Sequence, residues 1–218
     1  MQQMSRRNQH FTDSVIRRMT RVSLSCGAIN LAQGFPDFDP PKAMTDRLAE
    51  LSPIGPHQYP ITMGAPNFRQ ALARKCGRFM GRTLDPETDM VVTIGSTEAM
   101  VDTLFALTNP GDKVVMFSPY FENYRAQTLM VDCEPVFVPL VPPTFQFDPE
   151  RLEDAFRQHP KAILICNPSN PSGKVFTYDE LRLIAELCIR YDVYCIMDEV
   201  YEHIVYEGHT HTYMNSLP

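Results

Sequence analysis

A short apolar run ends abruptly in two carboxylic acids. The run YCIM at residues 194–197 is followed directly by Asp198 and Glu199, and the phenol of Tyr201 comes two residues later. A run of this length and composition predicts a buried strand. An unpaired carboxylate is costly to remove from water, so the sequence predicts a positively charged partner at the end of this strand. A helix N-cap or a salt bridge is the plainer interpretation of Asp198.

A second segment with chemical potential follows the strand that we predict at residues 90–94. There Gly95, Ser96 and Thr97 open a helix. Free backbone N–H groups, two hydroxyls and the positive end of the helix dipole suit this turn to an anion. Simple capping of the helix by Ser96 or Thr97 is the alternative. The turn is neither a P-loop nor a GxGxxG dinucleotide fingerprint.

Two further predicted strands, 113–117 and 162–166, also run into unusual segments. The first leads into SPYFENY (118–124), whose rings could stack on a flat heterocycle or pack the core. The second leads into NPSNPSG (167–173), where each proline favours an extended conformation for the preceding Asn. That conformation leaves the Asn amides free to face a ligand, although a plain turn is the alternative.

Alternating strands and helices must position these segments. Helical spacing predicts helices at about 66–80, 96–108 and 120–131. An N-cap at Asp148 followed by Pro149 predicts the start of another helix, and a capping box from Thr177 to Glu180 predicts a helix at 177–191. A further strand is predicted at 135–140. This order predicts an α/β fold with a mostly parallel sheet sandwiched by helices. Such sheets bind ligands beyond the carboxyl ends of their strands. A flat, phosphorylated, aromatic cation would satisfy all four strand ends, with a protonated ring nitrogen facing Asp198.

Composition narrows the function classes. The chain has 218 residues, a formal net charge of −6 and a pI near 5.5, which argues against nucleic acid as the main partner. Its apolar runs are too short to span a bilayer, and the polar, arginine-bearing first 25 residues do not resemble a secretory signal. The six cysteines form no CxxC pair or paired framework, which indicates a reducing compartment and a cytoplasmic protein.

Three histidines close in sequence raise the question of a metal. His203, His209 and His211 flank a Gly-containing turn without a cysteine pair. Zinc geometry is not evident in this spacing, so we predict surface histidines and no metal site.

Five motifs in order resemble one enzyme family. LAQGFPDFDPP, IGSTEAM, SPYFENY, NPSNPSG and MDEVYEHIVYEG are similar to segments of class I/II pyridoxal-phosphate-dependent aminotransferases of fold type I, in the kynurenine, methionine and aromatic aminotransferase-like branch. The resemblance runs from about Ile29 to about Gly208. It implies the fold-type-I transferase fold, with residues 1–45 as an N-terminal arm and part of a small domain. Residues 46–218 would be the first part of the large cofactor-binding domain.

The resemblance also implies a cofactor, pyridoxal 5'-phosphate, and residues that hold its ring. Asp198 would pair with the pyridinium nitrogen and keep it protonated, so that the ring acts as an electron sink. Asn170 and Tyr201 would hydrogen-bond the phenolic oxygen of the ring, and Phe121 would stack on the ring. Glu199 matches a family position without ring contact, and we assign it no chemistry.

Other matched positions concern the phosphate, the substrate and a second subunit. Ser96 and Thr97 would hold the phosphate through backbone N–H groups and hydroxyls. Tyr59 would reach the phosphate of the neighbouring subunit, which implies a homodimer with shared sites. Gly34 would lie near the substrate carboxylate, where a side chain would intrude.

One family feature is not found in this sequence. Catalysis in the family needs a lysine that forms the Schiff base with the cofactor and shuttles a proton. In the family it lies in a Ser-x-Ser-Lys-like motif beyond the MDEVY segment. The five lysines here lie in other contexts, and only Lys174 is near the proposed site. The resemblance therefore implies an N-terminal half with no catalytic residue of its own, inactive alone.

Three functions remain open at this point. The first is transamination between an amino acid and a 2-oxo acid, with this chain as a fragment of the full enzyme. The second keeps fold and cofactor but changes the reaction, to a carbon–sulfur β-lyase or an aminocyclopropane-carboxylate-synthase-like eliminase. The third is a non-catalytic, truncated module that binds the cofactor or dimerises.

Overall fold

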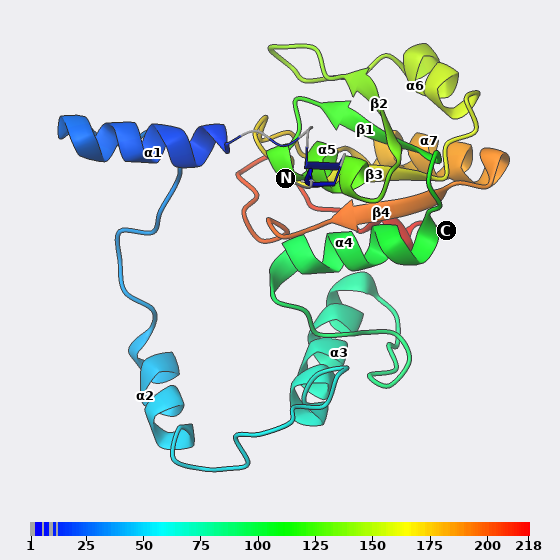
Figure 1. Cartoon of the computed structure of the whole chain (residues 1–218). Helices are drawn as coiled ribbons and strands as arrows, with labels where there is room; N and C mark the ends of the chain where they lie inside the picture. The colour runs from blue at the N-terminus through cyan, green and yellow to red at the C-terminus, as the bar shows by residue number, and fades with distance from the viewer. Residues whose placement is uncertain (1–2, 6, 9–10, 12) are drawn as a thin grey trace. The chain divides into compact units, whose positions relative to one another are not determined.

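A computed structural model describes residues 3–5, 7–8, 11 and 13–218 of the chain (Figure 1). Contacts divide the chain into two units, one of Met1–Phe11 with Asn67–Pro218 and one of Thr12–Pro66. Each unit is described by itself below. The domain boundary that we predict between residues 45 and 46 remains a prediction.

The unit Thr12–Pro66 contains two helices joined by irregular chain. α1 (Val15–Cys26) begins at Ser14, whose side chain accepts the backbone N–H of Arg17, and ends at Gly27 in the left-handed region at φ +64. α2 (Lys42–Leu51) lies in a segment for which the sequence predicts no helix. Its N-cap is Pro41, which makes no side-chain capping bond, so the usual polar start signal is missing.

The larger unit is built on a parallel sheet. Its strands are β1 (Lys113–Ser118), β2 (Glu134–Pro139), β3 (Ala162–Cys166) and β4 (Tyr194–Asp198). They lie in the order β2-β1-β3-β4, and every neighbouring pair is parallel (Figure 1). All four agree with predicted strands to within about one residue at each end.

Helices cover both faces of this sheet, and the alternation of side chains along each strand explains why. On one face lie α4 (Gly95–Leu107) and α5 (Glu122–Met130); on the other lie α6 (Pro149–Phe156) and α7 (Tyr178–Tyr191). Successive residues of β1 and β3 enter opposite core clusters. Val115, Phe117, Ile163 and Ile165 pack with α6 and α7, whereas Val114, Met116, Leu164 and Cys166 pack with α4 and α5. The predicted sandwich is confirmed.

Two helix starts follow the predicted capping chemistry. Asp148 accepts the backbone N–H of Glu150 and precedes a proline in the first turn of α6. Thr177 and Glu180 form a reciprocal capping box at the start of α7. The helix predicted at about 66–80 is also present, as α3 (Pro66–Met80).

The strand predicted at 90–94 is wrong. Residues 90–93 carry no regular structure and residue 94 is a bend before α4. A strand exists only as part of a hydrogen-bonded ladder, and in the described sheet β4 forms an edge without segment 90–94 beside it. Apolar, β-branched composition is therefore not sufficient here.

Two features of the fold bear on function. The carboxyl ends of β1, β3 and β4 meet at one edge of the sheet, because all strands are parallel and Cys166 pairs with Asp198 in register. Among the helices that the structure describes, none is both long and apolar enough to cross a membrane.

Candidate functional site

Asp198 is the last residue of β4, and its carboxylate accepts two hydrogen bonds. Tyr124 of α5 donates its hydroxyl to Oδ2 at 2.8 Å, and the backbone N–H of Val200 donates to Oδ1 at 3.2 Å. No ion pair to Asp198 occurs within the described residues, so the expected positive partner is not supplied by this part of the chain. A carboxylate offers about four acceptor positions, which leaves capacity for a further donor.

Tyr124 is buried, and it holds its proton. Burial raises the pKa of its phenol far above the usual value, and neighbouring Cys166 and Asp198 raise it further. The phenol therefore stays a donor and Asp198 stays the acceptor. The sequence placed Tyr124 in an aromatic segment but gave no sign of this bond, which joins residues 74 positions apart.

Asn170 and Tyr201 meet beside Asp198. The Asn170 side-chain nitrogen lies 3.4 Å from the Tyr201 hydroxyl, and both residues are half-buried. Asn170 comes from the loop after β3, and Tyr201 follows β4 by three residues. The backbone N–H of Asn167 donates to the carbonyl of Asp198 at 3.0 Å, which ties the two segments together. The structure therefore brings the predicted Asn170 amide and Tyr201 phenol into contact.

Ser96 and Thr97 lie exposed in the first turn of α4. The N-cap is Ile94, so neither hydroxyl caps the helix, and the capping alternative is wrong. The first N–H groups of a helix have no intrahelical acceptor, so this turn presents free donors. Gln127 of α5 donates to the Thr97 carbonyl at 2.8 Å and fixes the turn against its neighbour.

An open hollow of about 290 Å³ joins this turn to the end of β4. Its lining includes Ser96, Ala99 and Thr103 of α4 together with Asp198 and Glu199. The anion turn and the carboxylate therefore face one space.

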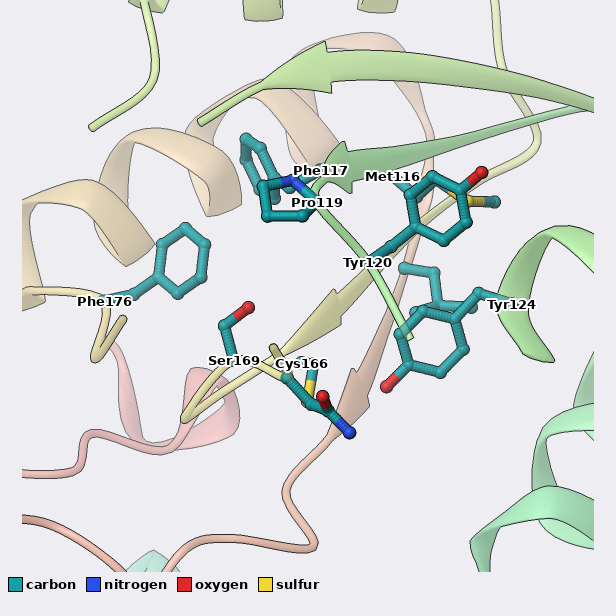
Figure 2. A pocket seen from close by; sticks show the side chains of 10 residues that line it. Met116, Phe117, Pro119, Tyr120, Tyr124, Cys166, Ser169 and Phe176 are labelled. Carbon is teal, nitrogen blue, oxygen red and sulfur yellow. The ribbon is translucent and has the colours of Figure 1, made fainter. Parts of the chain in front are cut away.

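The aromatic residues after β1 pack against different partners. Phe121 is half-buried and meets the ring of Tyr124 edge-on, with centroids 5.7 Å apart. Tyr120 stacks on Phe137 with ring centroids 5.0 Å apart. Tyr120 and Tyr124 also line the small cavity in Figure 2, which has these two rings on one side, Phe176 on the other, and Cys166 and Ser169 between them.

The remaining predicted site residues, Gly34 and Tyr59, belong to the unit Thr12–Pro66. Both are exposed, and Tyr59 is 94% exposed. Their roles toward substrate and a second subunit remain predictions.

The family model for class I and II aminotransferases matches residues 27–216. The chain belongs to this family. Within it, the chain is 35% identical over 225 residues to kynurenine–oxoglutarate transaminase 3 of Mus musculus, covering 98% of this chain and 50% of that protein. It is 38% identical over 203 residues to kynurenine–oxoglutarate transaminase 1 of Homo sapiens, covering 87% of this chain and 48% of that protein. This aminotransferase chain thus spans about half the length of the curated relatives it matches.

A solved aminotransferase shares the fold. The structure described as N-succinyldiaminopimelate aminotransferase from Mycobacterium tuberculosis superposes with a TM-score of 0.91 at 34% identity, covering 97% of this chain and 56% of that one. The predicted fold-type-I transferase architecture is therefore confirmed for the part of the family fold present here.

The class I and II aminotransferases depend on pyridoxal phosphate, and the residues of this chain fit that group. The exposed first turn of α4 offers donors to a phosphate. Asp198 has an open acceptor position for a protonated ring nitrogen, and Asn170 and Tyr201 meet nearby as donors for a ring oxygen. These groups lie at the first turn of α4 and beyond the carboxyl ends of β3 and β4, and their chemistry suits a phosphorylated heterocycle.

Two further side chains near the site, those of His211 and Lys174, are buried. His211 is not a surface histidine: its side chain is only 6% exposed. Lys174, the lysine nearest the site in sequence, is also 6% exposed and pairs with Glu180 at 2.7 Å. Among the described residues, no group of three or more His, Cys, Asp or Glu is placed to hold a metal ion.

Proposed function

We propose that this chain supplies the cofactor-binding half of an enzyme that transfers an amino group between an amino acid and a 2-oxo acid. The observation that carries the proposal is the carboxylate of Asp198 at the end of β4, held by Tyr124 and facing the same hollow as the α4 turn. Kynurenine–oxoglutarate transaminases among the relatives support an amino acid and a 2-oxo acid as the substrate classes.

Each residue of the site has a definite task in this proposal. Pyridoxal phosphate, when bound, supplies a ring that withdraws electrons from the α-carbon of the amino acid. Asp198 holds a proton on the ring nitrogen and keeps that ring electron-poor. Asn170 and Tyr201 hydrogen-bond the ring oxygen, and Phe121 contacts the ring face.

Binding of the phosphate falls to the α4 turn. Ser96 and Thr97 offer backbone N–H groups and hydroxyls at the positive end of the helix dipole. Asp198 lines the same hollow, so the cofactor would be held at its phosphate by the α4 turn and at its ring nitrogen by Asp198. A cofactor fixed at both ends keeps one orientation, and reactions at its ring depend on orientation.

We assign the covalent lysine to the half of the relatives that this chain does not match, because Lys174 is held in an ion pair with Glu180. We also propose a homodimer, in which Tyr59 reaches the neighbouring subunit. The 94% exposure of Tyr59 supports this role, because its ring packs little against the described residues of its own unit. Six free cysteines are compatible with the proposed cytoplasmic location.

Equilibrium dialysis with pyridoxal phosphate tests the proposal. We expect saturable binding by the 218-residue chain, and a loss of at least tenfold in affinity for Asp198→Ala. Asp102→Asn, at an exposed position of α4, serves as the control for removal of one negative charge and should bind like the wild type. Equal binding by Asp198→Ala and the control would refute the assignment of Asp198.

A further inference from the structure

Directly after Asp198, a second carboxylate is buried against a histidine. The side chain of Glu199 is 17% exposed and that of His211 is 6% exposed, and Glu199 Oε1 lies 3.4 Å from His211 Nε2. In the described part of the chain neither atom has a hydrogen-bond partner, so their 3.4 Å approach is a contact and not a formed hydrogen bond. Buried polar atoms without partners are costly, so a proton between these two atoms would satisfy both.

The other ring nitrogen of His211 determines where that proton lies. The backbone N–H of Phe176 donates to the side-chain oxygen of Asn167 at 3.0 Å, which fixes the orientation of the Asn167 amide. The amide nitrogen then faces His211 Nδ1 at 3.5 Å. An amide nitrogen only donates, so Nδ1 must accept and the proton of the neutral ring must lie on Nε2. The Nε2–H group and Glu199 Oε1, 3.4 Å apart, are therefore a matching donor and acceptor.

This chain of bonds joins the two segments that carry the cofactor residues. Asn167 is fully buried and begins the loop that holds Asn170. Its backbone N–H donates to Asp198, and its side chain holds Phe176 at the far end of the same loop. His211 connects this loop to Glu199, the residue after Asp198.

Electrostatics agree with a neutral ring. Burial lowers the pKa of His211, and nearby His203 lowers it further, whereas Glu202 acts in the opposite direction. Burial raises the pKa of Glu199 to about 7, and Glu202 and Asp198 add to the rise. The other titratable groups that face the pair are Cys195 of β4, Tyr213, whose ring meets that of His211 edge-on, and Lys75, which pairs with Glu202.

We propose that His211 is a positioning residue which, as the neutral Nε2–H tautomer between Glu199 and Asn167, holds the 167–176 loop against the end of β4. The loop then presents Asn170 beside Asp198. This inference rests on the proposed function, since the positioned residues are those of the cofactor site. Protonation of His211 would place an N–H group against the Asn167 amide and release the loop.

Two substitutions separate the two contacts of the ring. Asn at position 211 places an acceptor near the position of Nδ1, so His211→Asn keeps the contact with Asn167 and loses that with Glu199. Gln reaches the position of Nε2, so His211→Gln keeps a donor to Glu199 and leaves Asn167 without its acceptor. His209→Gln is the matched control, because His209 is exposed and lies two residues away.

The first readout needs no cofactor. Nitrogen-15 NMR of the imidazole at pH 7.5 should show His211 protonated on Nε2 only, and hydrogen exchange at the Phe176 amide should be slow. Exchange should be at least tenfold faster in His211→Gln than in His211→Asn or the control. A ring protonated on Nδ1, or equal exchange in all variants, would overturn the proposal.

The second readout is the affinity for pyridoxal phosphate. We expect His211→Gln to bind about tenfold more weakly than His211→Asn, which is the factor that a lost hydrogen bond supplies. Equal losses in both variants would mean packing alone and would also overturn the proposal. If the wild-type chain binds no cofactor, the proposed function fails, and the NMR and exchange results still decide whether His211 positions the loop.

Discussion

Replacing Glu199 by Gln should remove a pH dependence of stability that the wild type carries. Gln keeps an oxygen that accepts from His211 but has no charge to lose. The pKa of Glu199 is raised by burial to about 7 in the folded chain, against a reference value of 4.5. A raised folded pKa means that the stabilising contribution is fully present below 4.5 and is lost as the pH rises through about 7.

The magnitude follows from the shift. At about 1.36 kcal/mol for each pKa unit, the wild type loses roughly 3 kcal/mol of unfolding free energy from this group between acid and alkaline conditions. Most of that loss, about 2–3 kcal/mol, falls between pH 5 and 8. Glu199 is 17% exposed, so solvent screening reduces this value only modestly.

Urea unfolding followed by circular dichroism at pH 5, 6, 7 and 8 measures the effect. The unfolding free energy of Glu199→Gln should rise relative to wild type across this range. His211, whose folded pKa is lowered, destabilises both proteins as the pH falls below about 6.5. Because His211 contacts Glu199, the same comparison in the His211→Asn background removes that contribution. Glu207→Gln, at an exposed position, controls for net charge and should show no trend. A flat difference for Glu199→Gln would refute the reasoning.

Three further changes test separate parts of the structure. Tyr124→Phe removes the hydroxyl that holds Asp198, so affinity for pyridoxal phosphate in dialysis should fall by roughly tenfold or more, as for a hydrogen bond to a charged group; unchanged affinity would contradict that role. Thr177→Ala breaks the capping box of α7 and should lower the unfolding free energy in urea by about 1 kcal/mol, whereas a neutral effect would mean that the box adds no stability. Borohydride reduction of the chain mixed with pyridoxal phosphate, followed by peptide mapping, should yield no adduct at Lys174, because this lysine is buried in an ion pair with Glu180; a specific adduct there would overturn the assignment of the lysine to the unmatched half.

The strands, and the functional residues that follow each of them, could be predicted because the signals are local. Each strand of the sheet is a short apolar run, and its successor residues must lie at the carboxyl edge of a parallel sheet. That rule puts Asn170, Asp198 and Tyr201 at one edge, and the pairing of β3 with β4 makes them neighbours. Capping at Asp148 and Thr177 is equally local, and it was predicted correctly.

What could not be predicted depends on contacts between distant residues. Segment 90–94 has the composition of a strand, yet composition does not specify a partner ladder. The bond from Tyr124 to Asp198 and the burial of His211 depend on the packing of α5 and of residues 209–213 against β4. The spacing of the three histidines does not reveal that His211 is buried between Asn167 and Glu199.

Ring-nitrogen NMR of nitrogen-15-labelled pyridoxal phosphate bound to the 218-residue chain tests the central claim most directly. If Asp198 is the partner of the ring, the nitrogen should carry a proton at pH 7.5, and this proton should be lost in Asp198→Ala and retained in Asp102→Asn. A neutral ring nitrogen in the wild-type complex, or one that stays protonated without Asp198, would contradict the account.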